Sequence, residues 1–239
     1  MDDRLVGAVG VELSLVTVDL AIFTIRGGEL VVLLVERGTE PFAGKAALPG
    51  GRVRAHETLD AGARRELQEE TSVSPDRLHL EQLGAYGAPG RDPRGRVITV
   101  AYLALGPDLP VPRGGTDAVH AYWGRVEGLL ENPGNLAFDH DHIVADALER
   151  VRGEFEYTTV ATAFCPEVFT LTELRRVYER VWGRSLDPSN FRRKATKADG
   201  FVEATGQQRP QAAGRPAALY RRGPARLLSP PFLRTADRQ

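Results

Sequence analysis

Three glutamates, Glu66, Glu69 and Glu70, stand at positions i, i+3 and i+4 of a segment between Thr58 and Thr71 whose pattern predicts a helix. This spacing places all three carboxylates on one side of the helix, where like charges repel. A hard divalent cation such as Mg²⁺ takes oxygen ligands and would relieve that repulsion. The spacing therefore indicates a magnesium site, and a solvated polar face is the competing interpretation.

The glutamates belong to a longer pattern that follows the glycine-rich turn Leu48-Pro49-Gly50-Gly51. Its members are Gly51, Glu57, Arg65, Glu66, Leu67, Glu69, Glu70 and Val73. The stretch resembles the signature of the Nudix superfamily, α/β/α sandwich proteins that usually act on nucleoside diphosphates linked to another group. The resemblance implies that Glu66, Glu69 and Glu70 hold Mg²⁺. If the chain is a hydrolase, the resemblance also makes Glu57, Arg65 and Glu69 catalytic, with Arg65 orienting a glutamate through an ion pair.

Serine occupies position 72, just past the expected helix, where the Nudix pattern has glycine. We expect a left-handed backbone there, which costs a serine about 1 kcal/mol relative to glycine. The helix end is weakened, but every metal-binding carboxylate of the motif is retained. Ser72 alone therefore does not indicate loss of hydrolysis.

The two parts of the chain carry opposite charge. Residues 1–169 contain 16 Lys and Arg against 26 Asp and Glu, whereas residues 170–239 contain 15 against 6. A basic segment joined to an acidic body indicates a polyanionic partner, most simply nucleic acid. A solvated basic tail is the alternative, although hydrophobic periodicity after Thr170 favours a folded unit.

The basic segment has the pattern of a winged helix. Thr170 begins a capping box, and a first helix is expected to end at Gly183. A second helix is predicted from Asp187 to about Ala198, followed by short strands near 201–203 and 217–220. The predicted DNA-binding residues are Thr172, Asn190, Arg192, Arg193, Lys194, Lys197 and Arg215. A protein-binding or dimerisation role for this unit is the alternative.

The two features together resemble the Nudix-related transcriptional regulators of NAD metabolism. The specific stretches are Pro41–Lys45, Gly90–Gly95, Phe138-Asp139-His140, Phe169–Leu174, Asn190–Lys194 and Gly214–Tyr220. This resemblance implies a homodimeric repressor of NAD synthesis or salvage genes that binds a palindromic operator and responds to ADP-ribose. The expected ligand-binding residues are Arg37, Gly50, Gly51, Arg91 and Arg94, although the arginines near residue 91 could equally be solvated loop charges. The rival interpretation is a Mg²⁺-dependent ADP-ribose pyrophosphatase with an accessory basic domain.

The predicted architecture is α/β, with a Nudix α/β/α sandwich and a C-terminal winged helix-turn-helix domain. We place the first domain at residues 1–157, a linker at 158–168, the winged helix at 169–226 and a tail at 227–239 that frays after Pro230-Pro231. Strands are expected near 14–25, 30–35, 78–86 and 97–105, and a helix over 139–157.

Cysteine usage and hydropathy indicate the compartment. Cys165 is the single cysteine, and no apolar run approaches the length of about 20 residues that spans a bilayer. We therefore expect a cytoplasmic protein without a membrane partner. His140 and His142 are two residues apart near a helix start, so we expect local capping or solvent exposure, not a metal site.

Overall fold

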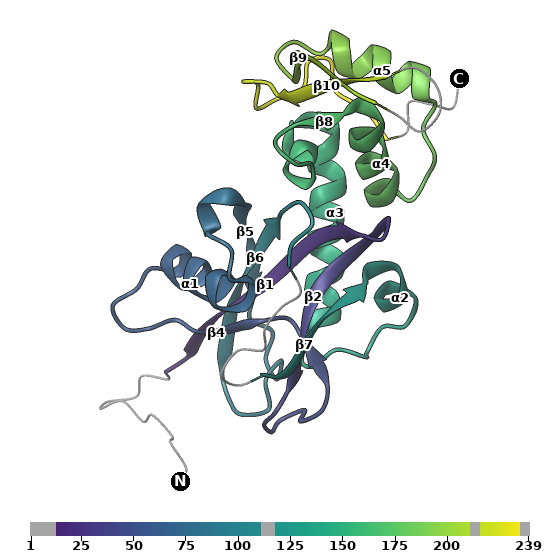
Figure 1. Cartoon of the computed structure of the whole chain (residues 1–239). Helices are drawn as coiled ribbons and strands as arrows, with labels where there is room; N and C mark the ends of the chain where they lie inside the picture. Colours follow the sequence, from purple (N-terminus) through teal and green to yellow (C-terminus); the bar gives the residue numbers. More distant parts are fainter. Residues whose placement is uncertain (1–12, 111–117, 211–215, 235–239) are drawn as a thin grey trace. The chain divides into compact units, whose positions relative to one another are not determined.

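The chain is described by a computed structural model for residues 13–110, 118–210 and 216–234 (Figure 1). Its contacts separate into two compact units. The first, here called the sheet unit, contains the residues up to Ile22, Val32–Ala104 and Pro110–Ala145. The second, here called the C-terminal unit, contains Phe23–Val31, Leu105–Leu109 and the residues from Asp146 onward.

A seven-stranded sheet has the strand order β3-β2-β1-β6-β5, with β4 paired to β1 and β7 paired to β2 (Figure 1). The strands are β1 (Leu15–Arg26), β2 (Glu29–Arg37), β3 (Ala46–Ala47), β4 (Gly50–Arg52), β5 (His79–Tyr86), β6 (Val97–Leu105) and β7 (Ala118–Arg125). Long apolar runs bury its centre, because residues 18–23 of β1 and 99–105 of β6 are all buried. The four strands predicted from the sequence are confirmed, whereas β7 was not predicted.

Helices α1 (Leu59–Thr71) and α2 (Val126–Glu131) and the short 3₁₀ turn η1 (Pro75–Arg77) belong to the sheet unit, whereas α3 (His140–Tyr157) contributes residues to both units. The predicted helix over 139–157 is confirmed as α3. Its apolar side, Ile143, Ala147, Leu148 and Val151, is at most 3% exposed. No helix in the described stretches is both long and apolar enough to cross a membrane.

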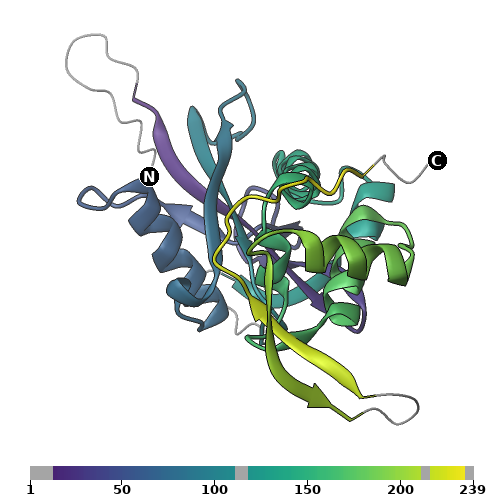
Figure 2. The same ribbon diagram turned by 90° about the horizontal axis from the view of Figure 1, so that it is seen from above.

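The C-terminal unit contains the predicted order of helix, turn, helix and hairpin. Its elements are η2 (Val160–Phe164), β8 (Phe169–Thr170), α4 (Leu171–Trp182), α5 (Pro188–Lys197), β9 (Val202–Arg209) and β10 (Ala217–Arg222). Thr170 and Glu173 form the predicted capping box, and Asp187 caps α5 as expected. Figure 2 shows β9 and β10 as a long hairpin that extends beyond α4 and α5.

An aromatic cluster forms the core of the C-terminal unit, with Tyr178 of α4 at its centre. The cluster consists of Phe155, Tyr178, Trp182, Phe191, Phe201 and Phe232. The Tyr178 ring lies 4.9 Å from Phe155, 5.3 Å from Phe191 and 5.7 Å from Phe232, measured between centroids. Because Phe191 is one of only two buried residues of α5, this cluster fixes that helix to the unit.

The tail does not fray directly after Pro230-Pro231, so that expectation is wrong. The backbone N–H of Leu228 donates to Tyr157 O, and that of Phe232 donates to Glu156 O, both at 2.8 Å. The Phe232 side chain is 4% exposed inside the aromatic cluster. Burial of one large ring outweighs the local turn propensity of two prolines, which is the reason for the error.

Each unit contains one of the two tryptophans of the chain. Trp123 of β7 donates its ring N–H to Pro110 O in the sheet unit at 3.1 Å. Trp182 packs against Tyr178 with ring centroids 4.9 Å apart and donates to Arg152 O at 3.2 Å. The two indoles therefore lie in different units.

Candidate functional site

Helix α1 positions the carboxylates of the glutamate motif. Thr58 caps its first turn by accepting a hydrogen bond from Ala61 N at 3.1 Å. The helix ends at Ser72, whose φ of 57° is left-handed, as predicted from the missing glycine. Leu67 is fully buried, and this anchors the helix so that Glu66 and Glu70 are 8% exposed.

Arg65 joins the carboxylates into one cluster. Its guanidinium donates to Glu57 at 2.7 and 3.1 Å, to Glu66 at 2.6 Å and to Glu69 at 3.4 Å. Hydrogen bonds from Arg65 lower the pKa of Glu57 to about 2. The predicted ion pair between Arg65 and a glutamate of the motif is therefore present.

Glu70 is the carboxylate that Arg65 does not reach. Its Oε2 atom is buried and has no hydrogen-bond partner among the described residues. Burial, together with the neighbouring charges of Glu66 and Glu69, raises the pKa of Glu70 to about 7. A buried carboxylate oxygen without a donor, beside two further carboxylates, is a donor set that fits a hard divalent cation.

Pairing with arginines also keeps the carboxylates of Glu57, Glu66 and Glu69 apart from one another. In the described part of the chain, no group of three or more His, Cys, Asp or Glu side chains is arranged to hold a metal ion. Glu69 is turned outward with a side chain that is 50% exposed, and it lies 3.8 Å from Arg54. Repulsion between carboxylates explains this separation, since Glu57, Glu66 and Glu69 pair with arginines instead.

The two glycines expected to bind ligand have a clear packing role. Strand β4 pairs with β1, with Gly51 opposite Val18 and Gly50 opposite Asp19. A Cβ atom on Gly51 would collide with the Glu66 carboxylate, and one on Gly50 would collide with the Val18 carbonyl. Glycine therefore lets β4 lie directly against both β1 and α1. Contact of these two glycines with a ligand stays a prediction.

A cavity of about 880 Å³ lies in the sheet unit and collects most of the predicted site residues. Its walls include Arg37, Gly50, Gly51, Arg65, Glu66, Glu69, Glu70, Arg91 and Arg94. Glu57 is not part of the wall and reaches it only through Arg65. The volume suits a nucleotide-sized ligand, and the wall is unusually rich in charged groups for a ligand pocket.

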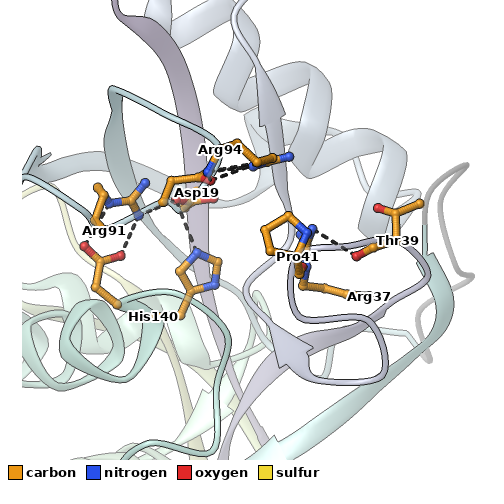
Figure 3. A network of polar contacts seen from close by, with 9 residues as sticks. Asp19, Arg37, Thr39, Pro41, Arg91, Arg94 and His140 are labelled. Atoms are coloured by element: carbon orange, nitrogen blue, oxygen red, sulfur yellow. Dashed lines mark hydrogen bonds and ion pairs between the residues drawn. The ribbon is translucent and has the colours of Figure 1, made fainter. Parts of the chain in front are cut away.

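Arg91, one of the expected ligand-binding residues, is buried in a network of charged side chains (Figure 3). Its side chain is 4% exposed and donates to Asp139 at 2.5 and 2.8 Å. Asp19 lies 3.6 Å from it on the other side. Both fork nitrogens are thus already engaged by carboxylates, so Arg91 shapes the wall, and a direct contact with ligand stays a prediction.

His140 belongs to the same network, which corrects the expectation that it caps a helix or faces solvent. The residue is 3% exposed, and its Nδ1 accepts a hydrogen bond from Leu48 N at 2.8 Å. The ring proton is therefore on Nε2, which faces Asp19 at 3.5 Å (Figure 3). Burial alone would raise the pKa of Asp19, but His140 and Arg91 together hold it below its usual value.

Arg37 and Arg94 are the predicted ligand residues that remain at the cavity surface. The Arg94 guanidinium is held by Asp92, with contacts of 2.6 to 3.2 Å, and its side chain is 46% exposed. Arg37 is oriented by backbone carbonyls, at 2.8 Å from Pro41 O and 3.4 Å from Thr39 O (Figure 3). Both lie over the Phe138 ring, at 4.7 Å for Arg37 and 5.6 Å for Arg94.

Sequence reasoning missed Asp19, Phe138, Asp139 and His140 as site residues. Asp19 lies between the buried residues 18 and 20 of β1 and is itself 8% exposed, and a buried carboxylate needs a partner that the local sequence does not show. The run Phe138-Asp139-His140 was noted only as a feature of the resemblance. Its role depends on contacts with residues about 50 to 120 positions away, which no local pattern encodes.

Three of the predicted DNA-binding residues of α5 lie on its outer side, and the other two, Asn190 and Lys194, are half-buried. Arg192, Arg193 and Lys197 are exposed, whereas Phe191 and Ala195 face the core. The Asn190 side chain accepts a hydrogen bond from Arg193 at 2.6 Å, so the amide expected to read a base is held by its neighbour.

Outside α5, Thr172 is exposed in the first turn of α4, and Arg209 of β9 pairs with Glu173 at 2.7 Å. Arg215 lies outside the described residues. Among the predicted DNA-binding residues that the structure describes, the exposed basic side chains therefore lie on α5, and Thr172 is exposed in the first turn of α4.

Two family models match the chain. A NUDIX domain matches residues 14–147, and an NrtR DNA-binding winged helix domain matches residues 161–222. The ADPR responsive transcriptional repressor NtrR of Acinetobacter baylyi is 38% identical over 209 residues, which cover 87% of this chain and 81% of the relative. The ADP-ribose pyrophosphatase of Methanocaldococcus jannaschii is 39% identical over 124 residues, which cover 51% of this chain and 68% of the relative.

Solved structures of one further relative are similar to this structure. Shewanella oneidensis NrtR complexed with a 27mer DNA has a TM-score of 0.74 and 35% identity, and the match covers 87% of this chain and 94% of that chain. The NUDIX domain of the same protein, complexed with ADP ribose, has a TM-score of 0.53 and 35% identity over 59% of this chain and 90% of that chain. The chain therefore belongs to the Nudix family, in the group whose members carry an NrtR DNA-binding winged helix domain.

Proposed function

We propose that this protein is a transcriptional repressor of NAD synthesis or salvage genes, which binds operator DNA through its winged helix and senses ADP-ribose in its Nudix cavity. One observation carries the proposal: a single chain combines a nucleotide-sized charged cavity with an exposed basic helix, and a repressor matches 87% of it. The resemblance recognised from the sequence points the same way.

The basic face of α5 is the proposed DNA-reading surface. Arg192, Arg193 and Lys197 are exposed and can contact phosphates or base edges in the major groove. A single winged helix makes few base contacts, so we infer a homodimer whose two α5 helices read the half-sites of a palindromic operator. Operator affinity should then fall steeply with salt, because Lys and Arg displace counterions from the phosphates.

Fluorescence anisotropy on fragments of the protein's own and neighbouring promoters tests the proposal directly. Titrations at physiological salt, with and without ADP-ribose, should give tight and sequence-selective binding that ADP-ribose weakens. A scrambled fragment of equal length and composition is the control. Absence of selective binding would overturn the DNA-binding role, and selective binding indifferent to ADP-ribose would overturn the sensor role.

Hydrolysis of ADP-ribose is the second candidate function, and the retained carboxylates favour it. Glu66, Glu69 and Glu70 would hold Mg²⁺, which supplies polarisation of the diphosphate and activation of water. The buried Glu70 oxygen, which has no hydrogen-bond partner in the part of the chain that the structure describes, supports this assignment. Arg65 would hold Glu57 and Glu66 in place, as its short hydrogen bonds to both indicate.

A pair of substitutions separates the two functions. Glu69→Gln should reduce Mg²⁺-dependent release of AMP at least about 100-fold if the motif is catalytic, and should leave operator affinity unchanged. Arg193→Ala should leave AMP release unchanged and weaken operator binding by about 1 to 3 kcal/mol. AMP release that is absent from the unsubstituted protein would reject hydrolysis and leave the regulator standing.

A further inference from the structure

The hairpin of β9 and β10, here called the wing, contains a bulge partway along its length. The register shifts at Leu219 of β10, which alone stands opposite residues 205–207 of β9. Gly206 in this bulge has a φ of 77°, which glycine adopts without strain. Because a bulge bends a strand and interrupts its ladder, pairing fixes the residues beyond it less firmly than those at the base.

The base of the wing and its outer part are held in different ways. At the base, β10 pairs with β8, with Tyr220 opposite Phe169, and Phe169 is buried. Beyond the bulge the strands extend away from the helices, and Gly206–Arg209 are all exposed (Figure 2). Burial against the core therefore fixes the base of the wing but not the outer part.

One ion pair joins the outer part of the wing to α4. The Arg209 Nη1 atom donates to Glu173 Oε1 at 2.7 Å. The other carboxylate oxygen of Glu173 accepts hydrogen bonds from Thr170 N at 2.7 Å and from Thr170 Oγ1 at 3.1 Å. Burial alone would raise the pKa of Glu173, but the Thr170 N–H and the Arg209 guanidinium hold it below its ordinary value. The two oxygens thus have separate roles, one in the capping box and one in holding the wing.

The ion pair lies beside a residue that is expected to touch DNA. Thr172 directly precedes Glu173 in the first turn of α4 and is exposed. A carboxylate without a partner at this surface would repel the phosphates of the DNA backbone. Arg209 neutralises that charge and restrains the wing at the same time.

We propose that Glu173 and Arg209 form a latch that holds the outer part of the wing in the position required for binding operator DNA. Arg209 is then a positioning residue and does not itself contact a phosphate. The latch orders the wing before DNA arrives, so binding does not have to supply the free energy of ordering it. Its role rests on the proposed function, because it presupposes operator binding by the winged helix.

Glu173→Gln in the full chain removes the charge that holds Arg209, while glutamine at this position still completes a capping box. Fluorescence anisotropy on a labelled fragment of the protein's own promoter should show an affinity about three- to fivefold lower, the range for an exposed ion pair. Without the latch the opposite sign is expected, because loss of a negative charge beside DNA strengthens binding.

Glu203→Gln is the matched control. It breaks the ion pair of Glu203 with Arg221, which is also exposed, measures 2.8 Å and lies within the base of the wing. This variant changes the charge by the same amount but leaves the wing joined to α4, so it should not weaken binding to the promoter fragment. An equal loss in both variants would overturn the latch.

Arg209→Gln separates positioning from direct contact with a phosphate. A latch predicts the same loss as in Glu173→Gln, an unchanged salt dependence, and no further loss in the double variant, because both substitutions break one interaction. Direct contact predicts that Arg209→Gln alone weakens binding and lowers the slope of log affinity against log salt by about one. That second pattern would overturn the latch.

Two measurements on the free protein separate the latch from a loss of folding. Amide hydrogen exchange at residues 207–209 should be faster in Glu173→Gln than in Glu203→Gln, and equal rates would contradict the restraint. Urea unfolding should give one free energy of unfolding for Glu173→Gln and Arg209→Gln. A loss confined to Glu173→Gln would assign the effect to the capping box and overturn the latch.

The outcomes also distinguish the latch from the proposed function. Selective binding to the promoter fragment with unchanged affinity in Glu173→Gln overturns the latch and leaves the DNA-binding role intact. Absence of selective binding by the unsubstituted protein overturns the DNA-binding role, and the latch with it.

Discussion

The two units organise their charges in opposite ways. In the sheet unit, arginines and carboxylates are buried against one another around the cavity, as with Arg91, which is 4% exposed between two aspartates. In the C-terminal unit, an aromatic cluster fills the interior and the basic side chains of α5 lie outside. Ion pairs between buried side chains fix the geometry of the cavity, whereas packing of aromatic rings fixes the position of α5. The two functions should therefore fail under different perturbations.

Phe232→Ala should give the largest effect, and it should affect the C-terminal unit. Removing this ring leaves a cavity beside Tyr178, Phe191 and Phe201 and should cost about 3 kcal/mol of unfolding free energy. Operator affinity should fall with it, because Phe191 anchors α5. Urea unfolding and anisotropy measure the two losses. The matched control is Leu227→Ala, at a side chain that is 69% exposed, and equal losses in both would contradict the role of the cluster.

Asp139→Asn perturbs the charge network of the sheet unit instead. This substitution leaves Arg91 buried without its bidentate partner. It should lower the free energy of unfolding by about 2 kcal/mol, a figure reduced for solvent screening because the Asp139 side chain is 24% exposed. Glu127→Gln breaks the exposed pair with Arg125 and should cost less than about 0.5 kcal/mol. The unfolding free energy from urea titration is the measurement. A loss in Asp139→Asn no greater than that control would mean that the buried network contributes little.

The pH dependence of stability should also come from the sheet unit. Because the folded state holds the pKa of Asp19 below its ordinary value of 3.8, the associated stability is present above that value and is lost as the pH falls below it. Asp19→Asn should remove this acid-sensitive part and flatten the acid limb of unfolding free energy against pH. Asp76→Asn, at a side chain that is 87% exposed, should leave the limb unchanged. If the unfolding free energy of Asp19→Asn still falls steeply at acid pH, the Asp19 carboxylate is not the source of the acid sensitivity.

Ser72→Gly should have the smallest effect and the opposite sign. Serine adopts φ 57° at the end of α1 with strain that glycine avoids, so the variant should gain about 0.5 to 1 kcal/mol. Ser74 is the control position, because its φ of −59° suits any residue. Ser74→Gly should therefore lose stability, since glycine gives the unfolded chain more conformational freedom. Thermal unfolding compares the two. A loss in Ser72→Gly would show that the hydroxyl makes a compensating interaction.

Local signals explain what the sequence could predict. The α1 limits, the Ser72 conformation and the capping box of α4 depend on residues within a few positions of one another, and all are confirmed. The burial of His140 depends on Leu48, and the burial of Phe232 depends on α3, α4 and α5. Those contacts arise only when distant segments meet. The predicted domain limits and the roles of single arginines at phosphate stay predictions for the same reason.

The separate placement of the two tryptophans makes the chain its own pair of spectroscopic probes. Trp182 lies in ring contact with Tyr178, where its emission depends on the packing of α4 and the tail, whereas Trp123 lies in the sheet unit. Single Trp→Phe variants would therefore give each unit its own fluorescence trace during denaturation. Two midpoints would show that the units unfold independently, and a common midpoint would measure how strongly sensing and DNA binding are energetically coupled.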